Sequence, residues 1–185
     1  YRTLGKTGLK VSALSLGVSA FGGVFGDVDP GECNACIDLA LDHGINLLDT
    51  SPFYGLTRSE AMLGRCLKGI PRNRYVLATK VGRYGTKMQD FDFSGPRVRR
   101  SVEESLQRLA VDYVDIIQCH DIEFGSLDQI INETIPALRQ LVREGKARFV
   151  GITGLPLKAF RTVLARAEAD TVLSYCHYAL NDTAL

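Results

Sequence analysis

Four side chains that can carry or orient a proton stand near the ends of short apolar segments of this chain: Asp49, Tyr54, Lys80 and His120. A tyrosine beside an ammonium can exchange a proton with a carbonyl or carbinol oxygen, and a nearby histidine can hold that oxygen by a hydrogen bond. No amino-acid side chain accepts a hydride, so a redox version of this chemistry requires a bound cofactor. The residues therefore predict proton transfer at a carbon–oxygen group.

Each of these residues also has a structural explanation when it is taken alone. Asp49 could cap the turn that follows it, Tyr54 could pack as a loop aromatic, and His120 could be a hydrogen-bonded core histidine. Lys80 fits such an explanation poorly, because the segment Val-Leu-Ala-Thr-Lys-Val is typical of a strand covered on both faces. A lysine buried there needs a partner carboxylate. We therefore expect Asp49 to hold Lys80 charged, and all four residues to share one pocket.

The expected role of Lys80 concerns the pKa of Tyr54. A tyrosine ordinarily titrates near pH 10, so its use near neutrality requires a drop of about 3 pH units, equivalent to about 4 kcal/mol. An ammonium about 4 Å away supplies roughly that amount at an effective dielectric of about 20. We expect Lys80 to lower the pKa of Tyr54 in this way, while His120 donates a hydrogen bond to the substrate oxygen.

The elements that position these residues alternate between short strands and amphipathic helices, which is typical of βαβ units and a parallel sheet. After a hairpin over residues 1–11, strands are predicted at residues 13–18, 46–49, 75–80, 113–119, 147–152 and 172–176. Helices are predicted between them, with start signals at Asp29-Pro30, at a Thr57-x-x-Glu60 capping box, at Pro96, near Ser126 and near Pro156.

Six strand–helix units in a row predict an α/β fold, a TIM (β/α)8 barrel of which about six units are present. The alternative is a doubly wound dinucleotide fold, which carries G-x-G-x-x-G after its first strand. The turn here reads Gly17-Val-Ser-Ala-Phe-Gly22-Gly23 and does not match. We expect residues 1–185 to form a single barrel domain that is incomplete at its C-terminus, with two further units beyond Leu185. Barrel chemistry takes place at the C-terminal strand ends, where the four candidate residues lie.

Composition excludes several classes of partner. Lys and Arg number 22 and Asp and Glu 21, a net charge of +1, so nothing indicates nucleic-acid binding. No apolar run is long enough to span a membrane. The five cysteines are an odd number and a chain of 185 residues needs no disulfides, which favours a reducing, cytoplasmic location. Cys33-x-x-Cys36 has no second Cys or His pair nearby, so we expect no metal site. Composition leaves the oligomeric state open.

Three segments resemble the catalytic segments of the aldo-keto reductases: Asp49-Thr-Ser-Pro-Phe-Tyr54-Gly55, Ala78-Thr79-Lys80 and Gln118-Cys119-His120. The opening Arg2-x-Leu4-Gly5-x-Thr7-Gly8 resembles the hairpin that closes the bottom of their barrel. The resemblance covers the whole chain. It implies that Tyr54 is the proton donor and acceptor, with Lys80 and Asp49 as its tuning pair. It also implies that His120 orients the substrate and that a nicotinamide dinucleotide binds in the barrel mouth.

A narrower likeness to the sugar dehydrogenases of this family is carried by residues 120–129, 133–137, 151–157 and 174–178. It implies oxidation of L-galactose at C1 to L-galactono-1,4-lactone, a step of ascorbate biosynthesis, with a small sugar as substrate. NAD is the expected cofactor and NADP the less expected one. The D-arabinose dehydrogenases, which share part of the pattern, and a general NADPH-dependent aldehyde reductase are alternatives. An alternative of another class is a non-catalytic, nucleotide-binding regulatory subunit, since channel-associated proteins resemble this fold.

The positions that bind the nicotinamide amide group in the family are altered here. Many members have Ser-Asn after the fifth strand, where this chain has Thr153 and Gly154, and Tyr175 replaces the usual Gln after the sixth. We expect Asp49, Thr153, Gly154 and Tyr175 to contact the cofactor. Thr153 would offer a hydroxyl and Tyr175 a phenol.

Overall fold

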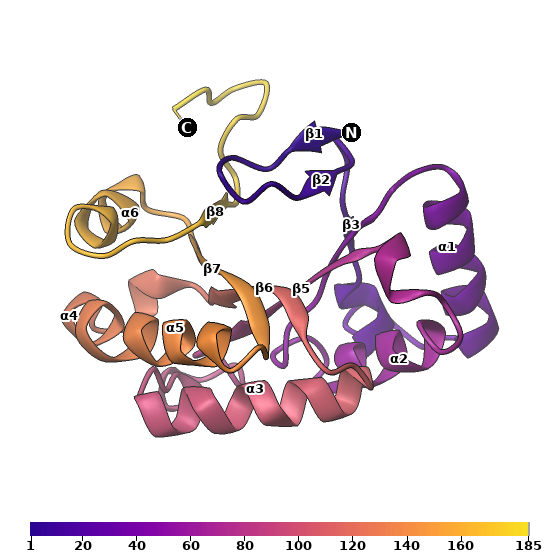
Figure 1. Ribbon diagram of the computed structural model, residues 1–185, viewed down its shortest axis with the longest axis horizontal. Coiled ribbons are helices and arrows are strands. Elements are labelled where there is room, and N and C mark those ends of the chain that lie inside the picture. The colour runs from indigo at the N-terminus through magenta and orange to yellow at the C-terminus, as the bar shows by residue number, and fades with distance from the viewer. Residues whose placement is uncertain (185) are drawn as a thin grey trace.

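A computed structural model describes residues 1–184, and its centre is one parallel sheet (Figure 1). Six strands follow chain order in the sheet, and each is hydrogen-bonded to the next. They are β3 (Leu16–Gly17), β4 (Leu47–Asp49), β5 (Val76–Val81), β6 (Val114–Cys119), β7 (Ala147–Gly154) and β8 (Thr171–Ser174). An antiparallel hairpin pairs β1 (Arg2–Thr3) with β2 (Lys10–Val11). The predicted hairpin and all six predicted strands are confirmed, although β3 is shorter than expected.

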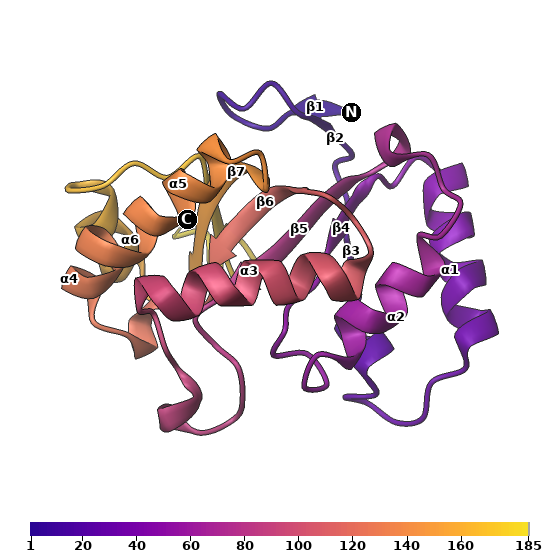
Figure 2. The same cartoon turned by 60° about the horizontal axis from the view of Figure 1, so that its bottom comes forward.

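The helices cover one side of this sheet, while the β1–β2 hairpin lies on the other (Figures 1 and 2). They are α1 (Pro30–Asp42), α2 (Arg58–Cys66), α3 (Gly95–Leu109), α4 (Leu127–Gln129), α5 (Ile135–Arg143) and α6 (Leu157–Leu164), together with a π-helical segment, η5 (Ile130–Thr134). Short 3-10 helices are η1 (Ser19–Gly22), η2 (Arg72–Arg74), η3 (Met88–Asp90) and η4 (Ile122–Phe124). Within residues 1–184, no helix has the length and apolar character needed to cross a membrane.

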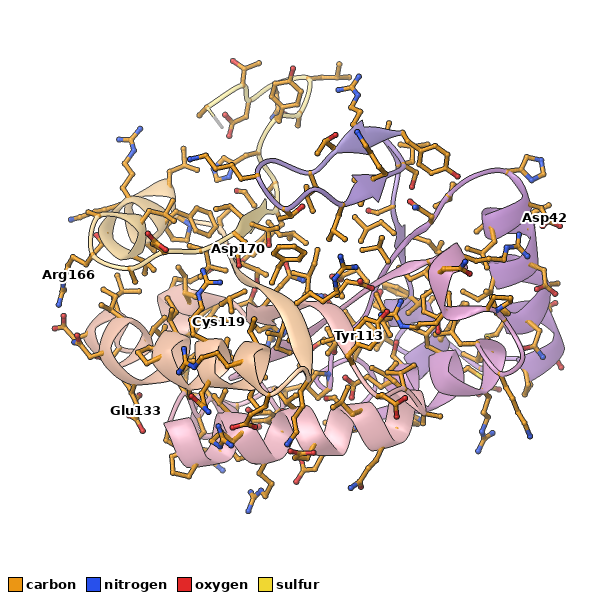
Figure 3. The ribbon with its side chains drawn as sticks, viewed as in Figure 1. Asp42, Tyr113, Cys119, Glu133, Arg166 and Asp170 are labelled. Carbon is orange, nitrogen blue, oxygen red and sulfur yellow. The ribbon has the colours of Figure 1, made fainter. Side chains whose placement is uncertain are left out.

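The sheet curls into part of a barrel, and its two faces pack against different partners. The larger core lies between the sheet and the helices and includes Leu48, Leu77 and Ile117, all fully buried. A smaller core lines the inner face, where the hairpin residues Leu9 and Val11 pack against the strands. In Figure 3, Cys119 lies on the sheet, whereas charged side chains extend outward from the helices. The architecture confirms the predicted α/β class and is that of a partial TIM barrel.

Strand alternation brings the polar candidates to the inner face. Every residue of β5 and β6 is buried, as expected for parallel strands covered on both sides. Side chains two residues apart share a face, so Lys80 follows Val76 and Ala78, which belong to the inner core. Lys80 is paired in register with Gln118 on β6, and Asp49 with Ala78. The sheet therefore places one ammonium beside one carboxylate and one amide.

The predicted capping box at the start of α2 is wrong. Thr57 has a left-handed backbone, with φ of 75°, and its side chain caps nothing. Glu60 is fully buried and turns away from the helix start, because it accepts hydrogen bonds from Thr79 on β5 (2.6 Å) and from Arg108 on α3 (2.7 Å). Tertiary ion pairing has replaced the local cap. By contrast, the predicted cap at Asp29 is confirmed, since its carboxylate accepts from the Glu32 N–H at 2.9 Å.

The helix predicted from Ser126 begins there but is not continuous. The Ser126 hydroxyl oxygen accepts from the Gln129 N–H at 3.4 Å. After α4 the chain passes through η5 before α5 begins. Pro136 explains the interruption, because it has no N–H to donate to the carbonyl four residues earlier and its ring crowds that carbonyl.

Helices α2 and α3 approach so closely at Gly64 that a side chain does not fit. A β-carbon there would lie 2.3 Å from the backbone oxygen of Arg108. We expect Gly64→Ala to reduce the free energy of unfolding by about 1–3 kcal/mol, because the two helix backbones must separate. Thermal unfolding of the protein measures this. The exposed neighbour Arg65 provides the control: Arg65→Ala is expected to change stability by no more than about 0.5 kcal/mol. Equal effects of the two substitutions would contradict the packing argument.

Candidate active site

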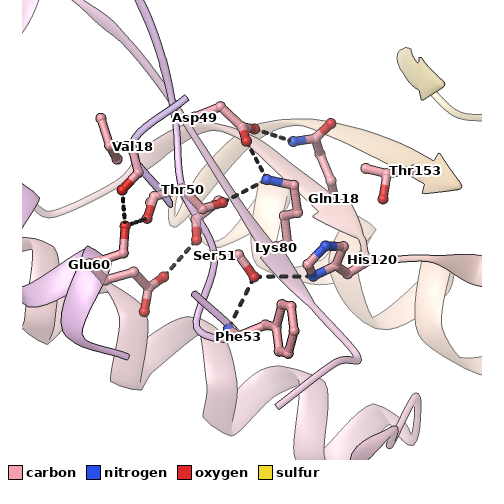
Figure 4. Close-up of polar contacts among 12 residues, drawn as sticks. Val18, Asp49, Thr50, Ser51, Phe53, Glu60, Lys80, Gln118, His120 and Thr153 are labelled. Carbon is pink, nitrogen blue, oxygen red and sulfur yellow. Dashed lines mark hydrogen bonds and ion pairs between the residues drawn. The ribbon is translucent and has the colours of Figure 1, made fainter. Parts of the chain in front are cut away.

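The inner face of the sheet holds a buried lysine with hydrogen-bond partners on neighbouring segments (Figure 4). The Lys80 ammonium is ion-paired with Asp49 and donates to the backbone oxygen of Thr50 at 2.8 Å. The second carboxylate oxygen of Asp49 accepts from the Gln118 amide at 3.1 Å. Only 2% of the Lys80 side chain is exposed, so the pair operates where water screens it poorly. The carboxylate partner that the sequence requires for Lys80 is therefore Asp49.

Lys80 keeps its charge in this environment. Burial alone pulls its pKa down, but the neighbouring Asp49 and Tyr54 outweigh that effect and leave the pKa above its usual value. An ammonium that is charged at every physiological pH acts as a fixed positive point on the inner face. The positive charge of Lys80 acts on the side chains that lie beside it.

Tyr54 is one of those side chains. The Lys80 nitrogen lies 4.9 Å from the centre of the Tyr54 ring, and the rings of Tyr54 and His120 meet edge to face at 5.7 Å. The four predicted residues thus converge on one place at the C-terminal ends of the strands. They come from β4, the loop after it, β5 and the residue after β6.

The backbone fixes Tyr54 by an unusual turn. The next three residues, Gly55, Leu56 and Thr57, all have left-handed backbone angles. Such angles are strained for Leu and Thr, and strain of this kind persists only where packing enforces it. The packing partner is Gly22. A β-carbon on Gly55 would lie 2.1 Å from the backbone oxygen of Gly22. Close contact with the segment after β3 therefore holds the loop that presents Tyr54.

The expected direction of the Tyr54 pKa is wrong. Burial of the phenol raises its pKa above 10, and the opposing effect of Lys80 does not outweigh it. The expectation from the sequence included the cation but not the loss of water around the phenol. Lys80 still lowers the pKa of Tyr54 relative to a site without the ammonium. The direction of its effect is therefore as expected, but burial outweighs it.

His120 is neutral in this site. It is 4% exposed, and burial together with the charges of Lys80 and Arg83 holds its pKa well below the usual range. Its Nδ1 atom lies 3.1 Å from the Ser51 hydroxyl oxygen. A neutral imidazole carries a single N–H, so it can donate one hydrogen bond to a substrate oxygen without carrying a charge.

An ion pair that the sequence did not reveal lies next to His120. Arg83 donates to Asp121 at 2.6 Å, and its guanidinium stacks 3.6 Å from the centre of the Phe53 ring. Asp121 has a left-handed backbone (φ 51°). Arg83 and Asp121 are 38 positions apart, so no local pattern pairs them. The available signal was that each lies two residues after the end of one of two neighbouring strands.

Of the four residues expected to contact a cofactor, Asp49 ends β4, whereas Thr153, Gly154 and Tyr175 lie at the ends of the neighbouring strands β7 and β8. Thr153 is 1% exposed, and its hydroxyl oxygen accepts from the Asp121 N–H at 3.0 Å, which leaves its proton to donate. At Gly154 a β-carbon would lie 2.4 Å from Oε2 of Glu123, a buried atom with no hydrogen-bond partner among the described residues. Thr153 and Gly154 are consecutive on β7 and therefore face opposite sides of the sheet, so the feature on the inner face that fits an amide oxygen is the Thr153 hydroxyl proton.

Tyr175 uses its phenol proton within the protein, and contact between Tyr175 and a cofactor stays a prediction. The hydroxyl donates to Oε1 of Glu123 at 2.8 Å, and burial together with this carboxylate raises the phenol pKa strongly. The contact with Glu123 instead ties the end of β8 to the segment after β6. Both oxygens of Asp49 have partners as well, so contact between Asp49 and a cofactor stays a prediction.

Metal chemistry has no ready ligand set in the described part of the chain. No group of three or more His, Cys, Asp or Glu side chains in residues 1–184 is arranged to hold a metal ion. The five cysteines are all free thiols, and Cys33 and Cys36 both lie on α1.

A parallel barrel sheet with a Lys–Asp pair, a tyrosine and a histidine at its C-terminal end defines a class of oxidoreductases. The profile of the Aldo/keto reductase family matches residues 13–183, and the chain belongs to that family. Members use a nicotinamide cofactor. The resemblance stated from the sequence is thereby confirmed.

Two curated proteins and one solved structure show how similar the chain is to individual members of the family. The chain is 57% identical to L-galactose dehydrogenase from Arabidopsis thaliana over its whole length, which is 58% of that protein. It is 39% identical to D-arabinose 1-dehydrogenase from Saccharomyces cerevisiae, over 80% of the chain and 47% of the relative. Among solved structures, an aldo-keto reductase from Pseudomonas aeruginosa matches 99% of the chain and 69% of its own, with a TM-score of 0.86 and 40% identity. The chain thus spans about half the length of these curated relatives.

Proposed function

We propose that the protein containing this chain oxidises L-galactose at C1 to L-galactono-1,4-lactone with NAD, a reaction on a route to ascorbate. We infer the reaction class, oxidation or reduction at a carbon–oxygen group, from the convergence of Tyr54, Lys80, Asp49 and His120. The similarity to the Arabidopsis enzyme supports the sugar. Free thiols at all five cysteines support a reducing, cytoplasmic setting.

The side chains divide the work at one oxygen. Tyr54 accepts the proton of the C1 hydroxyl, and the nearby Lys80 ammonium stabilises the resulting phenolate. Asp49 keeps Lys80 in place. The neutral His120 donates its N–H to the same substrate oxygen and so orients C1. The nicotinamide, when bound, supplies the acceptor for the hydride of C1.

Residues at the strand ends would hold that cofactor. Thr153 has a hydroxyl proton to donate to the amide oxygen, while Gly154 leaves room for the Glu123 carboxylate against the strand. In the direction of reduction the same residues would return a proton to a carbonyl. The site therefore supports either direction, and the substrate pair must be measured.

Steady-state rates of the complete protein test the proposal. We expect the highest kcat/KM with L-galactose and NAD, and weaker turnover when NADP replaces NAD. A higher kcat/KM with D-arabinose would favour the alternative suggested by the yeast relative. Faster NADPH-dependent reduction of aromatic aldehydes would contradict the sugar assignment. Nucleotide binding without turnover of any of these substrates would indicate a regulatory subunit.

A further inference from the structure

Ser51 connects the tyrosine and the histidine of the site. Its backbone oxygen accepts from the Tyr54 N–H at 3.1 Å, and its hydroxyl oxygen lies 3.1 Å from Nδ1 of His120. The same hydroxyl oxygen accepts from the Phe53 N–H at 3.1 Å (Figure 4). Ser51 is fully buried, so water cannot replace any of these contacts. The position of its one hydroxyl proton is therefore informative.

The hydrogen-bond inventory assigns that proton. A serine hydroxyl donates once and accepts twice. Among the described residues, the other group within reach of the Ser51 hydroxyl is Nδ1 of His120. If Nδ1 carried a proton, the Ser51 oxygen would accept from both Phe53 and His120, and its own proton would be buried without an acceptor. Leaving a buried donor unpaired is unfavourable, so the hydroxyl donates and Nδ1 accepts.

The opposite side of the imidazole favours the same arrangement. Nε2 of His120 lies 3.6 Å from a carboxylate oxygen of Asp121, which Arg83 holds in place. A carboxylate attracts an N–H and repels a ring lone pair, so it favours a proton on Nε2. The other charged or titratable groups near the ring are Lys80 and Tyr54.

We propose that Ser51 is a positioning residue that sets the tautomer of His120, so that Nε2 carries the proton and donates it in a hydrogen bond to the substrate oxygen. This matters because the ring is neutral: only one nitrogen can donate, and the wrong tautomer would present a lone pair to the oxygen it must hold. The assignment itself depends on geometry. Its kinetic consequence rests on the proposed function.

Nitrogen-15 NMR of the full-length protein, labelled at histidine, tests the assignment directly. Two-bond correlations show which ring nitrogen carries a proton, and His120→Gln identifies the His120 signals. We expect Nε2–H in the unmodified protein, a shift toward Nδ1–H in Ser51→Ala, and return to Nε2–H in Ser51→Thr, which keeps the hydroxyl. In kinetics we expect Ser51→Ala to lower kcat about tenfold or more while cofactor affinity stays within about twofold.

The outcomes separate this inference from the proposed function. A proton on Nδ1 in the unmodified protein would overturn the inference even if L-galactose is oxidised. An unchanged tautomer in Ser51→Ala would overturn it as well, because the tautomer would then be set by Asp121 without Ser51. Nε2–H in a protein that oxidises no sugar would support the tautomer assignment and contradict the proposed function instead. If Ser51→Ala does not fold, the tautomer of the unmodified protein and of Ser51→Thr still decides.

Discussion

Replacing Tyr54 by Phe is expected to reduce kcat by about 100-fold or more while leaving the fold and cofactor affinity nearly unchanged. The substitution removes only the hydroxyl that exchanges the proton. The ring remains, so its edge-to-face contact with His120 and its position near Lys80 are preserved. Rate, cofactor affinity and melting temperature are to be measured on the same samples of the full-length protein.

A second tyrosine provides the control for this experiment. The Tyr84 hydroxyl accepts from the Gly82 N–H at 3.1 Å, in the loop after β5. Tyr84→Phe is therefore expected to lower stability by about 1 kcal/mol without a large loss of rate. If Tyr54→Phe lowers the melting temperature but keeps near-normal turnover, then its hydroxyl is structural and the assigned mechanism is wrong.

Replacing Lys80 by Met should slow the reaction and move its pH dependence to higher pH. Lys80 lowers the pKa of Tyr54, so its removal raises that pKa further. Oxidation requires the phenolate, which then forms only at higher pH. The pH profile of kcat for sugar oxidation measures the change, and a profile that stays in place would exclude Lys80 as the tuning group.

The unpaired carboxylate left by Lys80→Met requires its own control. Asp49 raises the Tyr54 pKa, and without Lys80 it faces the site uncompensated. The double variant Asp49→Asn, Lys80→Met removes both charges. If the loss of the cation causes the change, the pH profile of kcat of the double variant stays displaced to higher pH by most of the amount seen in Lys80→Met. If the leftover carboxylate is the cause, the double variant returns to the original profile.

Much of the fold was predictable because burial on both faces of a parallel strand demands apolar residues. The strands β5 and β6 are mostly apolar, and Lys80 is one of the few polar or charged residues in them, with Thr79, Asp115 and Gln118. Element boundaries were less predictable where distant groups decide them. At α2 the local signal favoured a cap at Thr57, but Glu60 found partners on β5 and α3.

The site was predictable to the extent that strand ends converge. Period-two alternation and strand order are enough to bring Asp49, Lys80 and His120 together. The same argument would have placed Gln118 beside Asp49, although no role was assigned to it. Contacts such as that of Ser51 with His120, 69 positions apart, depend on the detailed course of loops. The pKa of Tyr54 depends on total burial, which no local pattern encodes.

The contact of Glu60 with Thr79 has a consequence for how the molecule moves. Thr79 precedes Lys80 on β5, and Glu60 lies on the helix that begins four residues after Tyr54. The buried Glu60 carboxylate therefore links α2, which follows the loop that carries Tyr54, to β5, which carries Lys80. We expect α2 and β5 to open together, because neither can separate from the other without leaving the buried Glu60 carboxylate short of a partner. The distance between Tyr54 and Lys80 is therefore maintained in part by a hydrogen bond, from Thr79 to Glu60, on the opposite face of the sheet.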